Sequence, residues 1–262
     1  MIELEQEFLR KEFSRFLKLE MKIVVHSSLS SFGLVRGGAQ TVIRALMEVI
    51  TPDGLIMMPS FTYGREPFNV FYTPAQTGRI PETFRQMESV KRSLHPTHSF
   101  CAWGSGAEQI LSGHNVPEPF KIGTPLYKAA QQDGYLLLIG VTQVANSLIH
   151  TAQELAQVPY LDRPKVVKIV ENGELRDMVV RRAGCSLGFD KITPLLEAQG
   201  LVSEYKIGQS KIVFMKAAEV LEKAAEVLKN DPYFLACDNP DCFACNEMRN
   251  FPTKESSHEK GS

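Results

Sequence analysis

A short apolar run, a loop rich in serine and glycine, and a helical pattern follow one another near the start of this chain. Residues 23–25 (IVV) are typical of a buried strand, and residues 41–50 have the periodicity of a helix. The loop between them begins as HSSLSSFG at residues 26–33 and contains a glycine pair at 37–38. Strand, loop and helix in this order predict a β–α unit, with N–H groups and hydroxyls at a helix N-terminus, where anions bind. The loop matches neither the dinucleotide-binding nor the P-loop pattern, so a structural turn and an anion site are equally supported at this point.

Further apolar patterns along the chain alternate between strand and helix. We expect one α/β domain over residues 1–250, with a mixed sheet flanked by helices, and a polar, disordered tail over residues 251–262. The second half contains an antiparallel section, because Asn172-Gly173 between two strand-like runs is a strong hairpin signal. The expected helices cover residues 3–19, 81–87, 107–111, 125–131, 147–157 and 217–228, and the other expected strands cover 55–58, 135–141, 166–170 and 175–182.

Composition excludes several classes of function. The 262 residues are 44% hydrophobic and 23% charged, as in an ordinary globular protein. A net charge of −1 gives no general attraction to nucleic acid or to an anionic membrane. No apolar run is long enough to span a bilayer, and the acidic start of the chain lacks a signal-peptide pattern. We therefore expect a cytoplasmic protein with no nucleic-acid or membrane partner.

His150 is the strongest candidate for acid–base chemistry. It lies near the start of the helix predicted after the most apolar strand, residues 135–141, and ligands of open α/β sheets gather beyond the carboxyl ends of strands. A histidine titrates near neutral pH and can take a proton from an attacking group. Glu154 lies one helical turn further on the same face and could orient the imidazole. From this pattern alone, a structural histidine remains the commoner case.

Three motifs, in this order, resemble the aminoglycoside 3-N-acetyltransferase family. The first covers residues 26–59, with HSSLSSFG, GGA, PDG and MP; the others are RSLHPTHSF at 92–100 and NSLIHTA at 146–152. The resemblance spans most of the chain apart from its ends. It implies a single-domain α/β fold and transfer of an acetyl group from acetyl-coenzyme A to an amine, with His150 as the general base.

The chain departs from the family pattern next to that histidine. The family usually places a carboxylate three residues after it, where this chain has Gln153 and then Glu154. Glu154 can replace the carboxylate, Gln153 can orient the ring alone, or a carboxylate can come from elsewhere in the chain. We favour His150 assisted by Glu154.

The resemblance also implies a coenzyme site. The serine loop lines the pantetheine arm and the phosphates, a neighbouring turn shapes the site, and a second block supplies Arg92 for a phosphate and His95 as a hydrogen-bond donor. The expected coenzyme residues are His26, Ser27, Ser28, Leu29, Ser30, Gly33, Val35, Gly37, Gly38, Arg92, Ser93, His95 and Pro96. His114, in a polar segment, is expected at the surface.

Three cysteines crowd near the C-terminus as Cys237-x4-Cys242-x2-Cys245, and Cys185 and Cys101 stand alone as small buried side chains. A structural zinc ion needs four ligands, and only Asp238 and His258 are candidates for the fourth. We therefore favour a cysteine-containing turn without metal, with zinc as the less favoured alternative.

The preferred acceptor is a small-molecule amine, namely an aminoglycoside-like amino sugar. One alternative keeps the chemistry and changes the acceptor to a biosynthetic amine, because loops set acceptor choice. A second is a non-catalytic protein that only binds coenzyme A. The sequence does not decide between a monomer and a homodimer.

Overall fold

The core of the computed structural model is a mixed sheet of seven strands in the order β3-β4-β2-β1-β5-β9-β8. The structure describes residues 3–161 and 163–251. The strands are β1 (Lys22–Ser27), β2 (Leu55–Pro59), β3 (Lys91–Arg92), β4 (Phe100–Gly104), β5 (Tyr135–Ile139), β8 (Ser203–Ile207) and β9 (Ser210–Lys216).

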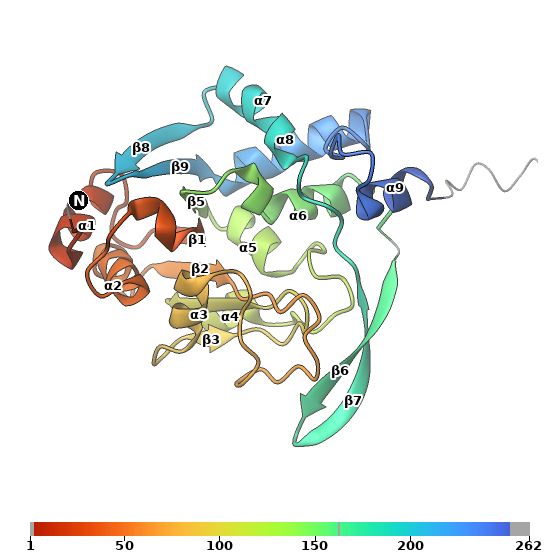
Figure 1. Cartoon of the computed structure of the whole chain (residues 1–262), viewed down its shortest axis with the longest axis horizontal. Helices are drawn as coiled ribbons and strands as arrows, with labels where there is room; N and C mark the ends of the chain where they lie inside the picture. Colours follow the sequence, from red (N-terminus) through yellow and green to blue (C-terminus); the bar gives the residue numbers. More distant parts are fainter. Residues whose placement is uncertain (1–2, 162, 252–262) are drawn as a thin grey trace, which may run out of the picture.

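Helices cover both faces of this sheet (Figure 1). Successive residues of a strand point to opposite faces, so Ile23 and Val25 join one apolar core while Val24 joins the other. The first core contains α1 (Gln6–Phe13), α2 (Ala39–Ile50) and α3 (Arg79–Arg85). The second contains α4 (Ala107–Leu111), α5 (Pro125–Gln131), α6 (Leu148–Leu155), α7 (Thr193–Ala198) and α8 (Ala217–Asn230). This three-layer arrangement confirms the predicted α/β fold class.

Three parallel strands form the centre of the sheet. β1 pairs in parallel with β2 on one side and with β5 on the other, so their carboxyl ends lie at the same edge. All other pairings in the sheet are antiparallel. Two antiparallel pairs in the sheet were not predicted: β8 and β9 in the second half of the chain, and β3 and β4 in the first half.

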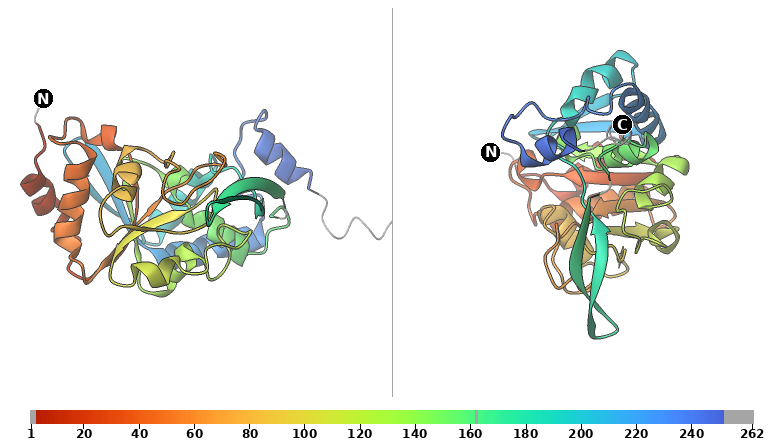
Figure 2. Two further views of the ribbon diagram at one scale, coloured as in Figure 1. Left: turned by 90° about the horizontal axis from the view of Figure 1, so that it is seen from below. Right: turned by 90° about the vertical axis from the view of Figure 1, so that its right-hand side faces the viewer.

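The predicted hairpin is a separate two-stranded ribbon of β6 (Pro164–Glu171) and β7 (Glu174–Arg181). Its turn residues Asn172 and Gly173 have φ angles of 52° and 83°, which glycine and asparagine tolerate best. The ribbon and α9 (Phe243–Arg249) lie at the end of the molecule away from the N-terminus (Figures 1 and 2). The chain that leaves β7 contacts the C-terminal segment, where Gly184 lies near Met248 and Gly188 near Ala236.

The first predicted helix is shorter than its apolar pattern. α1 ends at Phe13, and the backbone continues as turns in which Phe16 and Leu17 still reach the core. Phe16 stacks on Tyr205 of β8 at a centroid distance of 4.1 Å. The apolar period predicted burial correctly but overestimated the length of regular helix, because the backbone after Phe13 continues in hydrogen-bonded turns, such as Leu17 N–H to the Phe13 carbonyl at 2.9 Å.

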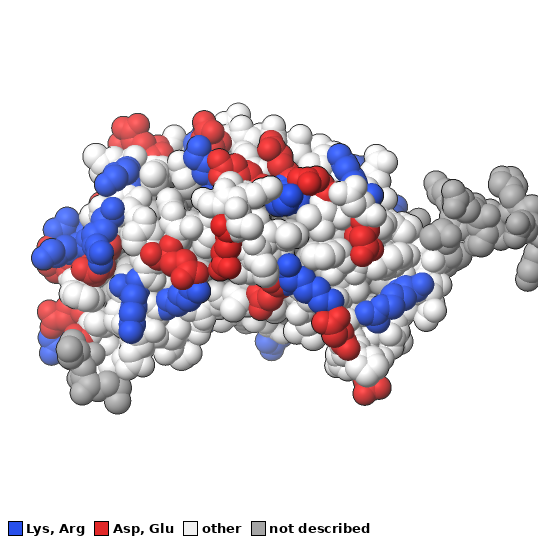
Figure 3. All heavy atoms as spheres, turned by 90° about the horizontal axis from the view of Figure 1, so that it is seen from above, with Lys and Arg blue, Asp and Glu red and all other residues white. Residues whose placement is uncertain are grey.

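Acidic and basic side chains lie close together on the face drawn in Figure 3. Short ion pairs at the surface include Arg36 with Glu5 and Lys211 with Glu204. Among the described helices, α8 is the longest at 14 residues and none could cross a bilayer. The expected C-terminal tail lies outside the described residues except for Phe251.

Candidate active site

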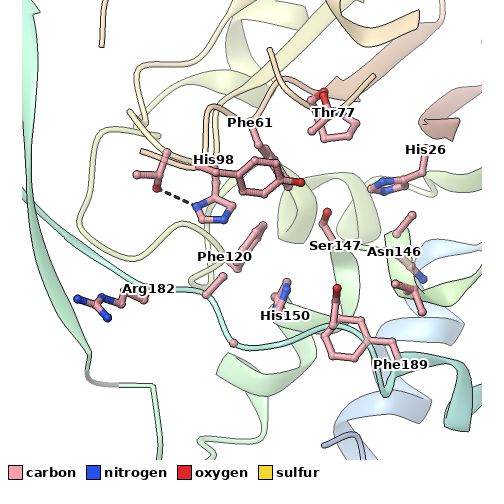
Figure 4. A pocket seen from close by; sticks show the side chains of 18 of the residues that line it. His26, Phe61, Thr77, His98, Phe120, Asn146, Ser147, His150, Arg182 and Phe189 are labelled. Atoms are coloured by element: carbon pink, nitrogen blue, oxygen red, sulfur yellow. Dashed lines mark hydrogen bonds between the residues drawn. The ribbon is translucent and has the colours of Figure 1, made fainter. Parts of the chain in front are cut away.

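A cavity of about 570 Å³ opens beyond the carboxyl ends of β1, β2 and β5 (Figure 4). His26 and Ser27 end β1, Pro59 ends β2, and the segment from Val141 to α6 follows β5. This is the edge where ligands of parallel α/β sheets bind, and the volume suits a small-molecule site.

Two other segments complete the walls. Residues 180–186, where β7 ends, form one side, and aromatic rings from three separate loops form another. The sequence did not predict these rings as a group, because they lie far apart in the chain and meet only in the fold. They are Phe61, Phe120 and Phe189.

His150, on the first turn of α6, points into the cavity (Figure 4). A chain of hydrogen bonds determines its tautomer. Tyr160 donates its O–H to the carbonyl of Pro232 at 2.7 Å, so its oxygen accepts from Gln153 Nε2 at 3.4 Å. Gln153 Oε1 then faces His150 Nδ1 at 2.8 Å, and an amide oxygen can only accept. Nδ1 therefore carries the proton, and Nε2 keeps a lone pair for a ligand in the cavity.

Aromatic packing and burial set the charge of this histidine. The imidazole stacks on Phe120 at 4.9 Å, and Phe189 approaches it edge-on at 4.9 Å. Burial lowers the pKa of His150 to about 4, against the opposing effect of the Gln153 hydrogen bond. The ring is therefore neutral at pH 7, as a general base must be before it accepts a proton.

Gln153, and not Glu154, contacts the imidazole in this structure. Glu154 is half-buried, and burial raises the pKa of its carboxyl group, with Glu118 nearby adding to the shift. No side-chain hydrogen bond joins Glu154 to the His150 ring among the contacts that the described residues make. Of the three sequence hypotheses, orientation by Gln153 is the one that the geometry favours.

Two polar groups at the end of β1 lack partners within the described protein. His26 Nε2 and Ser27 Oγ are buried without a hydrogen bond, and both residues line the cavity. Burial lowers the pKa of His26 to about 4, so this ring is neutral and has one N–H to donate. Buried polar atoms without partners are rare in folded proteins, and at a cavity wall they indicate a bound ligand.

The predicted serine loop lines a neighbouring groove of about 600 Å³, which meets the cavity at Ser27. Gly33, Gly37 and Gly38 have φ angles of 83°, 76° and 63°, and a Cβ at Gly37 would lie 2.5 Å from Thr41 Oγ1. The exposed Arg79, at the start of α3, lies at this groove and was not predicted. The predicted residues that line the groove are Ser27, Ser28, Leu29, Ser30, Gly33, Val35 and Gly38.

The second predicted coenzyme block lies elsewhere, and its polar groups bind the protein itself. The Arg92 guanidinium donates to the backbone carbonyls of Ser60, Val70 and Thr73, which belong to the long irregular segment after β2. Ser93 Oγ pairs with His114 Nδ1 at 2.8 Å. Neither Arg92 nor Ser93 lines the cavity or the serine-loop groove, so the predicted phosphate contact of Arg92 has no support from these positions.

His95, in the same block, is fully buried, and Pro96, which follows it in the chain, is buried too. Its Nδ1 accepts from the backbone N–H of His98 at 3.1 Å, and its Nε2 faces the Pro117 carbonyl at 3.4 Å. His114 was expected at the surface, which is wrong: it is 1% exposed and stacks on His95 at 5.1 Å. The histidine of this motif that does reach the cavity is His98, whose Nδ1 pairs with Thr97 Oγ1 (Figure 4).

The family model of the aminoglycoside 3-N-acetyltransferases matches residues 24–229. The chain therefore belongs to this family of acyltransferases. It is 31% identical to aminoglycoside N(3)-acetyltransferase IV of Salmonella sp over 214 residues, which cover 80% of this chain and 81% of that protein. It is 38% identical to the SPbeta prophage-derived aminoglycoside N(3')-acetyltransferase-like protein YokD of Bacillus subtilis (strain 168) over 171 residues, which cover 55% of this chain and 61% of that protein.

Solved structures agree with this assignment. The apoenzyme of aminoglycoside acetyltransferase AAC(3)-IVa superposes with a TM-score of 0.88 at 27% identity, covering 96% of this chain and 99% of that chain. A histidine-to-alanine mutant of that enzyme has been solved in complex with a gentamicin.

Proposed function

We propose that this chain transfers an acetyl group from acetyl-coenzyme A to an amino group of an aminoglycoside-like amino sugar, with His150 as the general base. The observation that carries the proposal is the hydrogen-bonded chain from Pro232 through Tyr160 and Gln153 to His150. It holds the ring in one tautomer and leaves Nε2 toward the cavity. Membership of the acetyltransferase family supports the reaction class.

His150 Nε2 takes a proton from the acceptor nitrogen as its lone pair forms a bond to the acyl carbon. As the nitrogen bonds to the acyl carbon, its N–H becomes far more acidic than a free ammonium group, so a base with a pKa near 4 can accept this proton. The acyl carbon–sulfur bond then breaks with its electron pair on sulfur, and the leaving thiolate takes the proton from His150. When bound, the coenzyme supplies an acyl group that is already activated, so no acyl-enzyme is required.

His26 and Ser27 are placed to receive the reacting carbonyl. Negative charge develops on the carbonyl oxygen during attack, and donors that are already positioned stabilise it without reorganisation. The neutral imidazole of His26 and the Ser27 hydroxyl are the buried groups without partners at this wall of the cavity. The adjoining serine-loop groove offers N–H and hydroxyl donors for the pantetheine arm, and Arg79 a positive charge for phosphate.

Gln153 orients His150 but gives little charge stabilisation to the imidazolium that forms. A carboxylate at this position would stabilise that cation more strongly, because the charges attract in a buried site. We therefore assign Gln153 as a positioning residue and Glu154 a weaker, indirect electrostatic role through its half-buried carboxyl group.

The test follows release of free coenzyme A from acetyl-coenzyme A with a thiol-reactive dye. Aminoglycosides, simpler amino sugars and amino-sugar nucleotides serve as acceptors, and a reaction without acceptor corrects for the five protein thiols. Release that depends on an aminoglycoside and is lost in His150→Ala supports the proposal. Full activity in His150→Ala contradicts the role of the histidine, and binding of coenzyme without turnover on any amine contradicts catalysis.

The charge of the cavity favours a second candidate acceptor. Lys165, Arg181 and Arg182 line it, and the described lining residues include no carboxylate. Glu118 pairs with Arg181 at 3.0 Å and offsets one of these charges. A polycationic aminoglycoside is attracted by acidic walls, whereas this wall suits an amine that also carries a phosphate or carboxylate. Turnover confined to such acceptors in the panel would support this biosynthetic alternative.

A further inference from the structure

A distant cysteine joins the three that crowd near the C-terminus, and the four meet beside α9. Their sulfur atoms all lie within 4.8 Å of one another, and all four thiols are free. The fourth member, Cys185, comes from the segment after β7. The prediction that Cys185 stands alone is therefore wrong. We call this group the four-cysteine cluster; it consists of Cys185, Cys237, Cys242 and Cys245.

The geometry of the four-cysteine cluster fits a tetrahedral metal site. Thiolates that bind zinc at about 2.3 Å lie about 3.8 Å from one another, so the sulfurs are already close to that spacing. Sulfur ligands select zinc over magnesium or calcium, which prefer oxygen. We propose that the four-cysteine cluster binds one structural zinc ion.

The environment suits thiolates. The backbone N–H of Cys237 points to Cys245 Sγ at 3.3 Å, and the N–H of Leu187 points to Cys185 Sγ at 3.4 Å. Such donors orient and stabilise metal-bound sulfur. Four thiolates around a divalent ion leave net negative charge, and two cations lie close by. Lys191 Nζ donates to the Ala236 carbonyl at 2.7 Å and also pairs with Asp238 at 2.6 Å, and Arg249 donates to the Cys237 carbonyl at 2.7 Å.

Leu235 and Met248 of the C-terminal segment belong to the second main core, but the residues around the cysteines do not. Among the described residues, the apolar cluster around the cysteines contains three buried ones, Ala236, Cys237 and Cys245. A core of this size buries too little area to order a segment by itself, and small units of this kind use metals or disulfides. The zinc ion supplies this stabilisation, because its binding energy becomes folding energy.

The zinc ion also ties the C-terminal segment to a wall of the cavity. Gly184 and Ser186 line the cavity, and Cys185 lies between them. Met248 of α9 packs against Gly184, where an added Cβ would lie 3.3 Å from its sulfur. We therefore expect loss of the metal to loosen this wall. The metal site itself does not rest on the proposed function.

The first experiment needs no variant. The full chain, purified under reducing conditions, is analysed for metals by mass spectrometry, and cobalt(II) is exchanged into it. The expected result is one zinc per chain, and a cobalt spectrum with strong thiolate charge-transfer bands and tetrahedral d–d bands. Absence of these bands after exchange would overturn the proposal, as would iron in place of zinc, or thiol counting that finds two disulfides.

Matched cysteine variants locate the site. Cys185→Ala should release zinc to a chromogenic chelator at least ten-fold more readily than the parent chain. Cys101→Ala is the control, because Cys101 lies in β4 outside the four-cysteine cluster, and its zinc content should equal that of the parent. Cys242→His should retain cobalt with weaker charge-transfer bands. Equal zinc retention in Cys185→Ala and Cys101→Ala would contradict the four-ligand site, and so would an unchanged spectrum in Cys242→His.

Discussion

His150 and His95 are both buried, and burial lowers the pKa of each to about 4. They differ in what their ring nitrogens contact. Both nitrogens of His95 face protein groups, the His98 N–H and the Pro117 carbonyl. Among the described residues, His150 has a hydrogen-bond partner at Nδ1 alone, namely Gln153, and the ring lines the cavity.

This contrast separates a histidine that stabilises a turn from one that is available for chemistry. Burial and a lowered pKa are common to both, so neither property identifies a catalytic group here. The discriminating feature is a ring nitrogen left for a ligand.

Replacing His150 removes the base. We expect His150→Ala to lower kcat by about 10²–10⁴-fold, the usual contribution of general base catalysis, while coenzyme binding persists. Steady-state kinetics and isothermal titration with coenzyme A measure the two effects. Loss of coenzyme binding to the same degree as kcat would assign His150 to binding instead.

Lowering the pH should destabilise the fold, because its buried histidines are neutral and become protonated on unfolding. His26, His95, His98, His114 and His150 all have a pKa lowered by burial. Below pH 6.5 the unfolded chain therefore binds more protons than the folded chain. The unfolding free energy has its full value above that pH and falls as the pH drops toward 4. Each histidine contributes up to about 1.4 kcal/mol per pH unit. Urea unfolding at pH 7 and pH 5 should differ by several kcal/mol in unfolding free energy; equal values would contradict burial of these rings in neutral form.

Replacing His95 should lower the unfolding free energy and leave catalysis nearly unchanged. His95→Ala leaves the His98 N–H without its acceptor, which costs about 1–3 kcal/mol of unfolding free energy. Denaturant unfolding measures the loss, and His150→Ala is the matched control with a smaller change. Near-normal kcat in the folded fraction of His95→Ala would complete the contrast, whereas a stable but inactive variant would move His95 into the site.

Changing the group on Nδ1 tests the positioning role of Gln153. Gln153→Glu places a carboxylate beside the imidazole, so the pKa of His150 should rise. The acid limb of kcat/KM should move to higher pH, and kcat should change by no more than about ten-fold, the factor that one pKa unit represents. The neutral variant Gln153→Ala should lower kcat without that shift. Identical pH profiles in both variants would show that Gln153 does not influence the base.

The smallest effect is expected at Glu154. Among the described contacts its carboxyl group makes no hydrogen bond with the His150 ring, so Glu154→Gln should change kcat by less than about three-fold, since charge effects between groups not in contact are weak. Initial rates at saturating acceptor measure it. A loss as large as that of His150→Ala would restore the carboxylate partner that we first favoured.

Much of the fold could be predicted from local patterns. Helices α4 and α5 were predicted at residues 107–111 and 125–131, where the structure has them, because their apolar spacing and the first-turn Pro125 need no distant partner. Strands β8 and β9 were not predicted. Their short mixed runs become strands because β5 offers β9 an edge, as in the pairing of Leu138 with Val213.

The same division holds at the site. The serine loop, His150 and the helix that carries it follow from residues close together in the sequence, whose periodicity and turn chemistry act locally. Three features of the site depend on the tertiary structure. Gln153 is held against His150 by Tyr160, which in turn binds the carbonyl of Pro232. His95 turns away from the cavity, and Cys185 meets three cysteines more than fifty residues further along the chain. Each depends on contacts between distant segments. Such contacts form only when the two apolar cores bring the segments together, and no spacing along one stretch of chain encodes them.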